Sequence, residues 1–265
     1  MYIFRGQSWL LENEQSFQIE IVEENWGTIK IEDVRHLLEE VVGIFLGCFD
    51  TSFCVSVCVE CRPHHITPEV QCTNALTGDY VVSLTAQDYR LLPYQFAHEL
   101  CHVLSGYTNL NLLPNKWFHE SLCELASIFI LKQMAINCRE SSSLSKGFDD
   151  YANRLITYPD FQLPNDLTLS NWFKANEQNL RFDSCQRNKN GIVAVQLLPL
   201  MEKNPKNWEC ICFIPDSAGS FEEFLQEWRA RCPEPQKLLV TDIIEMFGFD
   251  SHQLQWVKRE SQNKD

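Results

Sequence analysis

The chain has 265 residues, of which 45% are hydrophobic and 22% charged, a composition typical of a globular protein and not of a disordered one. Its formal net charge of −14 provides no basic surface for phosphate groups, so we expect neither a nucleic-acid partner nor a membrane partner. The sequence has no apolar run long enough to cross a bilayer and no signal-peptide pattern at its start, which predicts a cytoplasmic protein. The oligomeric state is not predicted.

The twelve cysteines allow two interpretations. An even number of cysteines can form a disulfide framework, as it does in small secreted proteins. In a chain of this length that lacks an export signal, reduced and mostly buried thiols are the favoured interpretation.

The early part of the chain carries strand patterns and one helix pattern. Residues 17–22 (FQIEIV) alternate apolar and polar side chains, as a half-buried strand does. Residues 31–49 place apolar side chains at helical spacing, which predicts an amphipathic helix that covers this strand. Two further strands are predicted at residues 53–59, which are rich in cysteine and β-branched residues, and at residues 79–85.

The later part of the chain is predicted to be mostly helical. One helix covers residues 93–105 and ends at Gly106, and a second covers residues 116–136 after a Leu-Pro-Asn break. Helix-period apolar residues predict three more helices, at residues 192–201, 220–231 and 237–247. Strands early in the chain and helices later indicate an α+β fold.

The run His98-Glu99-Leu100-Cys101-His102 (HELCH) in the first of these helices is the strongest functional signal. Positions four apart share one helix face, so the His98 and His102 imidazoles can bind one metal ion, and zinc prefers such ligands. Glu99 lies beside that face, where it can act as a general base on a zinc-activated water. The alternative is a chance match, against which the apolar side of the segment and the strand upstream both argue.

A catalytic zinc site needs a third protein ligand, and the following helix offers two carboxylates. Glu120 and Glu124 lie one turn apart on a mostly apolar helix. Burying such groups without a cation is costly, so a nearby metal ion is a natural explanation. The alternative is a solvent-facing stripe of His119, Glu120 and Glu124.

HELCH followed by WFHESLCELAS resembles the gluzincin metallopeptidases, in which HExxH is followed by a helix with the pattern W-[LF]-x-E-G-x-A-E-[YF]. The resemblance covers residues 79–129 and assigns Glu120, 18 positions after His102, as the third zinc ligand. It assigns Glu124 as the second acidic residue, which supports a histidine or the metal from outside the ligand set. It also implies that residues 79–85 form the edge strand that lines the cleft and pairs with an extended substrate.

The resemblance further implies a zincin-like α+β domain. We expect a small N-terminal sheet, the HExxH helix and a mostly helical C-terminal lobe that closes one side of the cleft. The corresponding division is a strand and helix part at residues 1–75, a zincin core at residues 76–136 and a helical lobe at residues 137–265.

Gluzincins commonly use a tyrosine or histidine to stabilise the oxyanion, and this residue is not evident here. In the segment NKNGIVA, Asn188 stands where the family has the tyrosine, and its amide can still donate a hydrogen bond. The other candidates are Tyr107, His119, Tyr151 and Tyr158.

Other cysteines have two interpretations each. Cys58 and Cys61, with the histidines at 64–65, could bind a second, structural zinc, although the strand pattern here and the lack of a second ligand pair argue against it. Cys101 and Cys123 lie on the two helices of the proposed site, where they are either small core residues or thiols that oxidise or compete for the metal.

The combined prediction is a zinc metallopeptidase. His98, His102 and Glu120 bind Zn²⁺, and Glu99 activates the water that hydrolyses a peptide or protein substrate. One alternative is a zinc-binding protein of the same fold that acts as a scaffold or interaction partner with little or no catalysis, which the missing tyrosine supports. Another is a metal-free interaction module in which HELCH is a coincidence. The sequence names no particular substrate and does not distinguish exopeptidase from endopeptidase.

Overall fold

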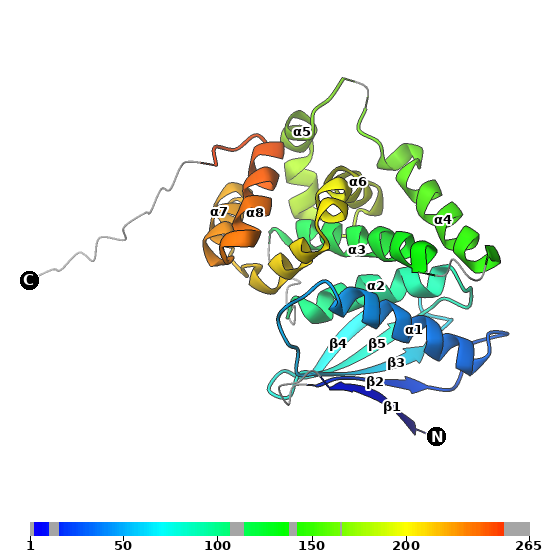
Figure 1. Cartoon of the computed structure of the whole chain (residues 1–265). Helices are drawn as coiled ribbons and strands as arrows, with labels where there is room; N and C mark the ends of the chain where they lie inside the picture. Colours follow the sequence, from blue (N-terminus) through cyan, green and yellow to red (C-terminus); the bar gives the residue numbers. More distant parts are fainter. Residues whose placement is uncertain (1–2, 11–15, 107–113, 138–141, 165, 252–265) are drawn as a thin grey trace, which may run out of the picture.

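The computed structural model describes residues 3–10, 16–106, 114–137, 142–164 and 166–251. A sheet from the early part of the chain lies on one side of the molecule and a helical lobe on the other (Figure 1). The helices α2 (Leu91–Leu104) and α3 (Lys116–Asn137) lie between them. Strands precede most helices along the chain, so the predicted α+β class with a helical C-terminal lobe is confirmed.

The sheet is mixed and has the strand order β1-β2-β3-β5-β4. Its strands are β1 (Ile3–Leu10), β2 (Ser16–Val22), β3 (Val55–Cys61), β4 (Glu69–Asn74) and β5 (Asp79–Leu84). β2, β3 and β5 run parallel, whereas β1 pairs antiparallel with β2, and β4 pairs antiparallel with β5. β2, β3 and β5 confirm the three predicted strands.

The buried face of the sheet is built from apolar residues in register. Ile19 of β2 lies opposite Val57 of β3, which lies opposite Tyr80 of β5, and all three side chains are buried. The residues that alternate with them along β2 and β3 are half-buried or exposed. This alternation is what a sheet covered mainly on one face requires.

The edge strand of the sheet on the side of β5 is β4. Because β5 pairs with β3 on one side and with β4 on the other, the prediction that residues 79–85 form the edge strand is wrong. The β4 segment, EVQCTN, places only two apolar residues, Val70 and Cys72, between polar ones, and both are only partly buried, so its alternation is a weak strand signal. The chain reverses between β4 and β5 at Gly78, whose positive φ and close approach to the Cys54 carbonyl leave no room for a side chain.

The buried face of the sheet is covered by α1 (Ile31–Leu46) and α2 (Figure 1). α1 buries residues at helical spacing, including Val34, Leu38 and Phe45, which confirms the predicted amphipathic helix. α2 is buried on nearly all sides, because the sheet lies against one side and α3 against another. The Gln95 side-chain oxygen accepts hydrogen bonds from the backbone N–H groups of Thr85 and Ala86, at 3.0 and 2.9 Å, and so fixes the start of α2 to the end of β5.

The helical lobe packs around α3. Its elements are α4 (Ser142–Ile156), η2 (Pro159–Phe161), α5 (Leu169–Phe182), α6 (Arg187–Lys203), η3 (Pro205–Phe213), α7 (Phe221–Arg231) and α8 (Glu234–Met246). Trp117 and Phe118 of α3 pack against Phe221 of α7, with ring centroids 4.7 and 5.1 Å apart. α6, α7 and α8 confirm the three late helices, and Ser220 caps α7 as the capping-box pattern requires.

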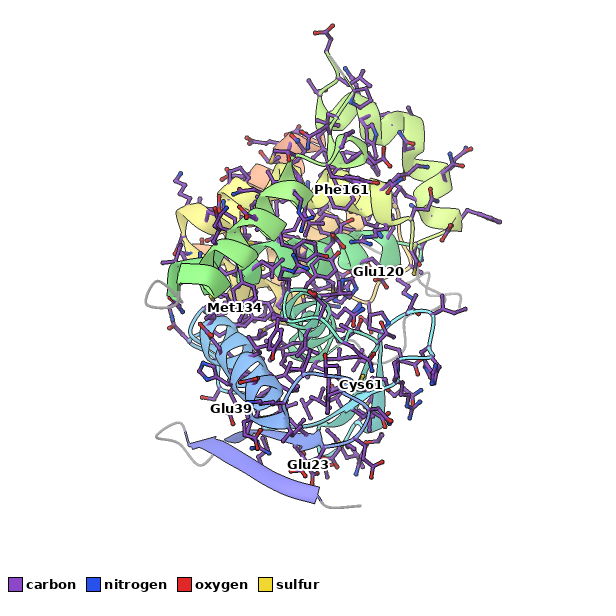
Figure 2. All side chains as sticks on the ribbon, turned by 90° about the vertical axis from the view of Figure 1, so that its right-hand side faces the viewer. Glu23, Glu39, Cys61, Glu120, Met134 and Phe161 are labelled. Atoms are coloured by element: carbon purple, nitrogen blue, oxygen red, sulfur yellow. The ribbon has the colours of Figure 1, made fainter. Side chains whose placement is uncertain are left out.

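Figure 2 shows Glu120 at a level between Cys61 of the sheet and Phe161 of the helical lobe. The two layers therefore meet at the part of α3 that carries the predicted third ligand. Within the described ranges, no helix combines the length and the apolar character needed to cross a bilayer.

Candidate metal centre

α2 presents His98 and His102 toward α3, one helical turn apart. Their ring centroids are 5.2 Å apart, which is the separation expected of an i, i+4 pair on a straight helix. His102 is buried and His98 is half-buried, and both line a cavity. Because α2 is held on nearly all sides by the core, the two imidazoles are presented from a rigid element.

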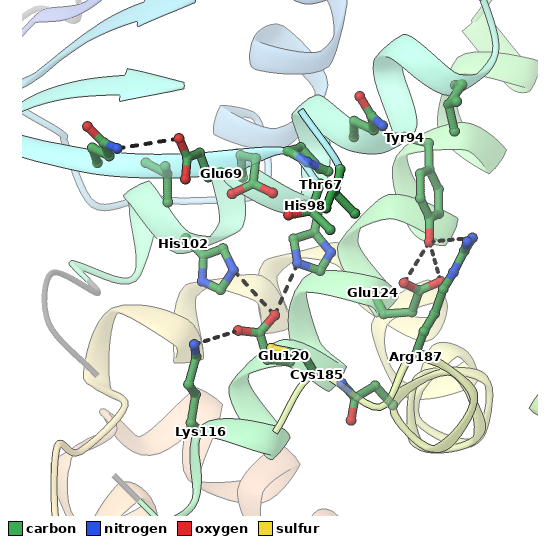
Figure 3. A pocket seen from close by; sticks show the side chains of 18 residues that line it. Thr67, Glu69, Tyr94, His98, His102, Lys116, Glu120, Glu124, Cys185 and Arg187 are labelled. Carbon is green, nitrogen blue, oxygen red and sulfur yellow. Dashed lines mark hydrogen bonds and ion pairs between the residues drawn. The ribbon is translucent and has the colours of Figure 1, made fainter. Parts of the chain in front are cut away.

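Glu120 of α3 completes a cluster with these imidazoles. Its Oε2 atom lies 3.3 Å from His98 Nε2 and 3.6 Å from His102 Nε2, as Figure 3 shows. Its other oxygen, Oε1, lies 3.5 Å from the ammonium group of Lys116. The structure thus brings together the three residues that the sequence predicts as metal ligands, around one carboxylate oxygen.

The members of this cluster shift one another's pKa values. Burial by itself lowers the pKa of His98, but the hydrogen bond to Glu120 and the nearby carboxylates raise it to about 9. Burial by itself raises the pKa of Glu120, but hydrogen bonds from His102 and His98 hold it well below its ordinary value. The Glu120 carboxylate is therefore ionised, and the groups around it supply positive charge that a metal ion can replace.

A second possible third ligand is Cys123. One ligand atom each from His98, His102 and Cys123 lies within 4.8 Å of the others, so these residues can also hold a metal ion. The Cys123 sulfur lies 3.5 Å from His102 Nδ1, whereas Glu120 approaches Nε2, the other nitrogen of the same ring. Two candidate ligand sets therefore share the two histidines.

Glu124, one turn after Glu120, lies in a different environment. The Tyr94 hydroxyl donates to its carboxylate, with contacts of 2.5 and 2.6 Å to the two oxygens. Arg187 of α6 donates to the Tyr94 oxygen at 3.2 Å and lies 5.5 Å from the centre of the tyrosine ring. Burial, followed by the charge of Glu124, raises the pKa of Tyr94 well above its ordinary value, so the phenol keeps its proton.

The cluster opens into a cavity of about 730 Å³. Figure 3 shows Thr67 and Glu69 on one side of the imidazoles and Cys185 and Arg187 on the other. The first pair belongs to the entry into β4 and to β4 itself, so the edge strand forms one wall of the cavity. A site that faces a cavity of this size has room for a ligand molecule beside the protein groups.

Glu99 lines the same cavity and is 4% exposed. Its pKa is raised, because burial disfavours the carboxylate more strongly than the neighbouring His98 and His102 favour it. A raised pKa brings a carboxyl group closer to the range in which it both accepts and returns a proton near neutral pH.

The interpretation of His119, Glu120 and Glu124 as a solvent-facing stripe is wrong. All three are buried, because α3 is enclosed by α2 and by the helical lobe. His119 does not line the cavity but stacks on His102, with ring centroids 4.9 Å apart.

The candidates for the oxyanion-stabilising residue that the structure describes do not line the cavity. Asn188 is exposed and its amide donates to Asp160 at 3.0 Å. Tyr158 is 46% exposed and packs against Phe161, while Tyr151 lies behind Tyr94. Tyr107 lies outside the described residues. The position at which the gluzincins have a tyrosine is therefore occupied by Asn188, whose side chain faces away from the cavity.

The cysteines of the described chain are free thiols, as the sequence analysis favours. Cys58 is half-buried on β3 and Cys61 is buried on the core side, while the neighbouring histidines at 64–65 are exposed. Among the described residues, the group around His98 and His102 is the one in which three ligand atoms converge, so the structure gives no support to a second zinc site at Cys58.

Sequence reasoning missed three groups of the cavity: Tyr94, Lys116 and Arg187. Two carry a local signal, because Tyr94 precedes His98 by four positions and Lys116 precedes Glu120 by four, which places each pair on one helix face. Arg187 carries no such signal, since it reaches Tyr94 from a helix 93 positions later in the chain.

Comparisons with known proteins add no assignment: no family model, no curated protein and no solved structure matches the chain. The candidate site is therefore interpreted from its own geometry and from the motif that it carries.

Proposed function

We propose that the protein is a zinc-dependent hydrolase of the metallopeptidase type. The observation that carries the proposal is the convergence of His98, His102 and Glu120 at the wall of a cavity that Glu99 also lines. Two imidazoles and one carboxylate are a common protein ligand set of catalytic zinc, with one coordination position left for water. The HELCH motif and the WFHESLCEL helix, similar to those of gluzincins, favour the same reaction class.

Glu120 fits the third ligand position better than Cys123 does. Glu120 lines the cavity, whereas Cys123 is fully buried and does not. Burial raises the pKa of the Cys123 thiol well above its ordinary value, while the Glu120 carboxylate is already ionised. A metal ligand must be deprotonated, so Glu120 binds at a lower energetic cost.

The chemistry follows from the residues around the cavity. Zinc, when bound, supplies a Lewis acid and makes water acidic enough to lose a proton near neutral pH. Glu99 accepts the proton that the attacking water loses and returns it to the leaving nitrogen. Its burial and raised pKa suit both halves of this transfer.

Lys116 is the group that we assign to the developing negative charge on the carbonyl oxygen. Asn188 faces away from the cavity, and the Tyr94 hydroxyl donates to Glu124. Lys116 lines the cavity beside Glu120, so its ammonium group lies next to the proposed zinc position. A cation at this place stabilises the oxyanion as the expected tyrosine does in the gluzincins.

The substrate class that we infer is an extended peptide. β4 is an edge strand and forms a wall of the cavity, and edge strands bind extended chains through backbone hydrogen bonds. Such pairing positions a peptide bond across the cavity from the wall that carries Cys185 and Arg187.

The alternative is a zinc-binding scaffold with little or no catalysis. The observation that favours it is the position of Asn188, whose amide is committed to Asp160 outside the cavity. A structural zinc site is usually closed by four protein ligands, whereas this cluster faces open space. We therefore retain catalysis as the first proposal.

The variant Glu99→Gln tests the proposal. We expect it to bind about one zinc per chain, as the untagged native protein does by elemental analysis, and to lose chelator-sensitive cleavage of a peptide library. Glu24→Gln is the matched control, because Glu24 is exposed and does not line the cavity. It should retain both properties.

Three outcomes contradict the proposal in different ways. Cleavage that persists in Glu99→Gln refutes the assigned base. Zinc without chelator-sensitive cleavage in the native protein favours the scaffold. Zinc far below one per chain supports the metal-free module.

A further inference from the structure

Arg187, the first residue of α6, places a positive charge in the cavity wall opposite the edge strand. The residue is exposed and lines the cavity. Its Nη2 atom donates to the Tyr94 hydroxyl oxygen at 3.2 Å, and its guanidinium also forms a hydrogen bond with Tyr151. Within the described part of the chain, these contacts with phenols are not accompanied by an ion pair to a carboxylate. The nearby Glu124 is separated from Arg187 by the Tyr94 hydroxyl, which donates to the carboxylate and accepts from the guanidinium.

The other charged groups of the cavity wall make Arg187 distinct. The wall also contains the cation Lys116, which lies 3.5 Å from the Glu120 carboxylate and so has an acidic partner. A guanidinium carries more N–H donors than two phenols accept, so Arg187 has donors left for a ligand. Its planar fork matches the two oxygens of a carboxylate. A substrate carboxylate in this cavity is therefore attracted to Arg187, whereas the acidic side chains of the wall repel it.

The position of Arg187 relative to the candidate metal centre follows from the pairing of two helices. Tyr94 of α2 contacts Glu124 of α3, and four positions further along α2, His98 contacts Glu120. Four helical residues rise about 6 Å, so the Tyr94 hydroxyl that Arg187 contacts belongs to the turn next to the candidate ligands. Figure 3 shows Tyr94 and Arg187 on one side of this cluster.

This spacing corresponds to one residue of a substrate. An extended residue spans about 3.3–3.6 Å. A carboxylate lies about 3 Å from the group that donates to it. A peptide whose scissile carbonyl lies at the metal position can therefore bring a carboxylate of the neighbouring residue to the Arg187 guanidinium.

The surroundings of Arg187 hold it in place before a ligand arrives. The guanidinium carbon lies 5.5 Å from the centre of the Tyr94 ring. The Asn190 amide, one turn later, donates to the Ser184 carbonyl at 2.9 Å and ties the preceding loop to α6. Gly191 lies against the Phe161 ring with no room for a side chain, so α6 packs closely on the rest of the lobe. A cation on such a fixed element loses little conformational entropy when it binds an anion.

We propose that Arg187 is the specificity-determining residue of the candidate site and binds a carboxylate of the substrate residue beside the scissile bond. The inference rests on the proposed function and names its substrate class. The carboxylate has two possible sources that present the same group to the guanidinium. One is the C-terminus of the peptide, in which case the protein removes single residues from that end. The other is the side chain of Asp or Glu, in which case it cleaves next to an acidic residue.

The first test maps cleavage by the native protein in a peptide library by mass spectrometry. We expect cuts one residue from a free C-terminus or next to Asp or Glu. A cleaved peptide is then remade with an amidated C-terminus, and separately with Asn or Gln in place of its acidic residue. One of these changes should lower kcat/KM by about 10- to 100-fold, as the loss of hydrogen bonds to a charged group does, and so identifies the source. Equal cleavage of all forms overturns the inference.

The second test asks whether Arg187 causes this preference. Arg187→Met should cleave the carboxylate peptide and its neutral counterpart at similar rates, and Arg187→Lys, which keeps the charge without the fork, should recover part of the preference. Arg154→Met is the matched control, because Arg154 lies 5.5 Å from the centre of the Tyr151 ring but does not line the cavity. It should prefer the carboxylate as the native protein does.

A merely structural role for Arg187 gives a different result, because it slows cleavage of both peptides by the same factor. A preference that survives in Arg187→Met therefore overturns the assignment. Circular dichroism identifies a variant that fails to fold, and Arg187→Lys then decides in place of the methionine variant.

Binding to zinc-loaded Glu99→Gln separates this inference from the proposed function. The probes are an acetylated tripeptide that ends in Asp with both carboxylates free, and its counterpart that ends in Asn amide. Calorimetry should show about 10- to 100-fold tighter binding of the first, and the difference should vanish when Arg187→Met is added. The same result in a protein that cleaves no peptide refutes the hydrolase and keeps the carboxylate site. Equal binding of the two probes overturns the carboxylate site even in a protein that cleaves peptides.

Discussion

Glu120 and Glu124 are the same residue type, one turn apart on the same buried helix, yet their surroundings differ. Both line the cavity, but Glu120 has two imidazoles and an ammonium group at 3.3 to 3.6 Å. Glu124 accepts short hydrogen bonds from one phenol, at 2.5 and 2.6 Å, and Arg187 supports that phenol.

If the proposed function holds, this difference makes Glu120 a binding carboxylate and Glu124 a structural one on the same helix. Around Glu120 the positive charge comes from groups that can give up a proton or move aside, so a metal ion can take their place. The donor to Glu124 is the neutral Tyr94 hydroxyl, which supplies no positive charge that a metal ion could replace. We therefore expect substitutions at the first position to change zinc binding and substitutions at the second to change stability.

The largest expected effect is at Glu120. Glu120→Ala should weaken zinc binding by more than about 100-fold, since loss of a direct ligand costs more than loss of an outer partner. Zinc at a thousand-fold excess over its Kd stabilises a protein by about 4 kcal/mol, so the native melting temperature should rise with zinc and that of the variant should not. Thermal unfolding with and without zinc measures this. An equal zinc response in Glu120→Ala and the native protein contradicts the assignment and points to Cys123.

The second-largest effect is expected at Lys116, the cation beside Glu120. Lys116→Met should lower kcat by about 100-fold, as the loss of one oxyanion-stabilising donor does, while the zinc content remains near one per chain. Lys116→Arg, which keeps the charge, should recover part of the rate. Steady-state kinetics on a peptide cleaved by the native protein, combined with elemental analysis, makes the measurement. An unchanged kcat in the methionine variant means that another group stabilises the oxyanion.

The smallest effect is expected at Glu124. Glu124→Gln keeps the shape and an acceptor for Tyr94 but removes the charge, so it should lower the free energy of unfolding by about 2 kcal/mol, the scale of a buried hydrogen bond to a charged group. Zinc affinity should stay within a few-fold of the native value. Urea unfolding and chelator competition measure the two quantities. A large loss of zinc with unchanged stability would reverse the roles that we assign to the two carboxylates.

The helices that carry the candidate site, and the shared face of its two histidines, could be predicted because their signals are local. His98 and His102 share a helix face through their spacing alone, and the apolar period of α3 predicts that Glu120 is carried on a helix. The shared core of the sheet and the lobe brings the two helices together. No local pattern predicts this contact, and only the family resemblance indicated it.

The errors and omissions have physical causes as well. The alternation in β4 is short, because only Val70 and Cys72 pack against the core and both stay partly buried, so the sequence does not identify this strand and the edge position is predicted for β5. The contact of Arg187 with Tyr94 spans 93 positions and follows from how α6 crosses α3, which no local pattern encodes. The contacts of Cys123 with His102 and His119 were not predicted, since a buried cysteine on a helix is usually a small core residue.

The open edge of β4 also limits what can enter the cavity. If backbone pairing to this strand is how a substrate is held, the incoming chain must give up its own helix or sheet over several residues before it is bound. This local unfolding costs free energy in a compact protein, whereas a loop, a terminus or a short peptide does not need to unfold. On this proposal, the edge strand would favour polypeptide segments that are loosely folded, independently of their side chains.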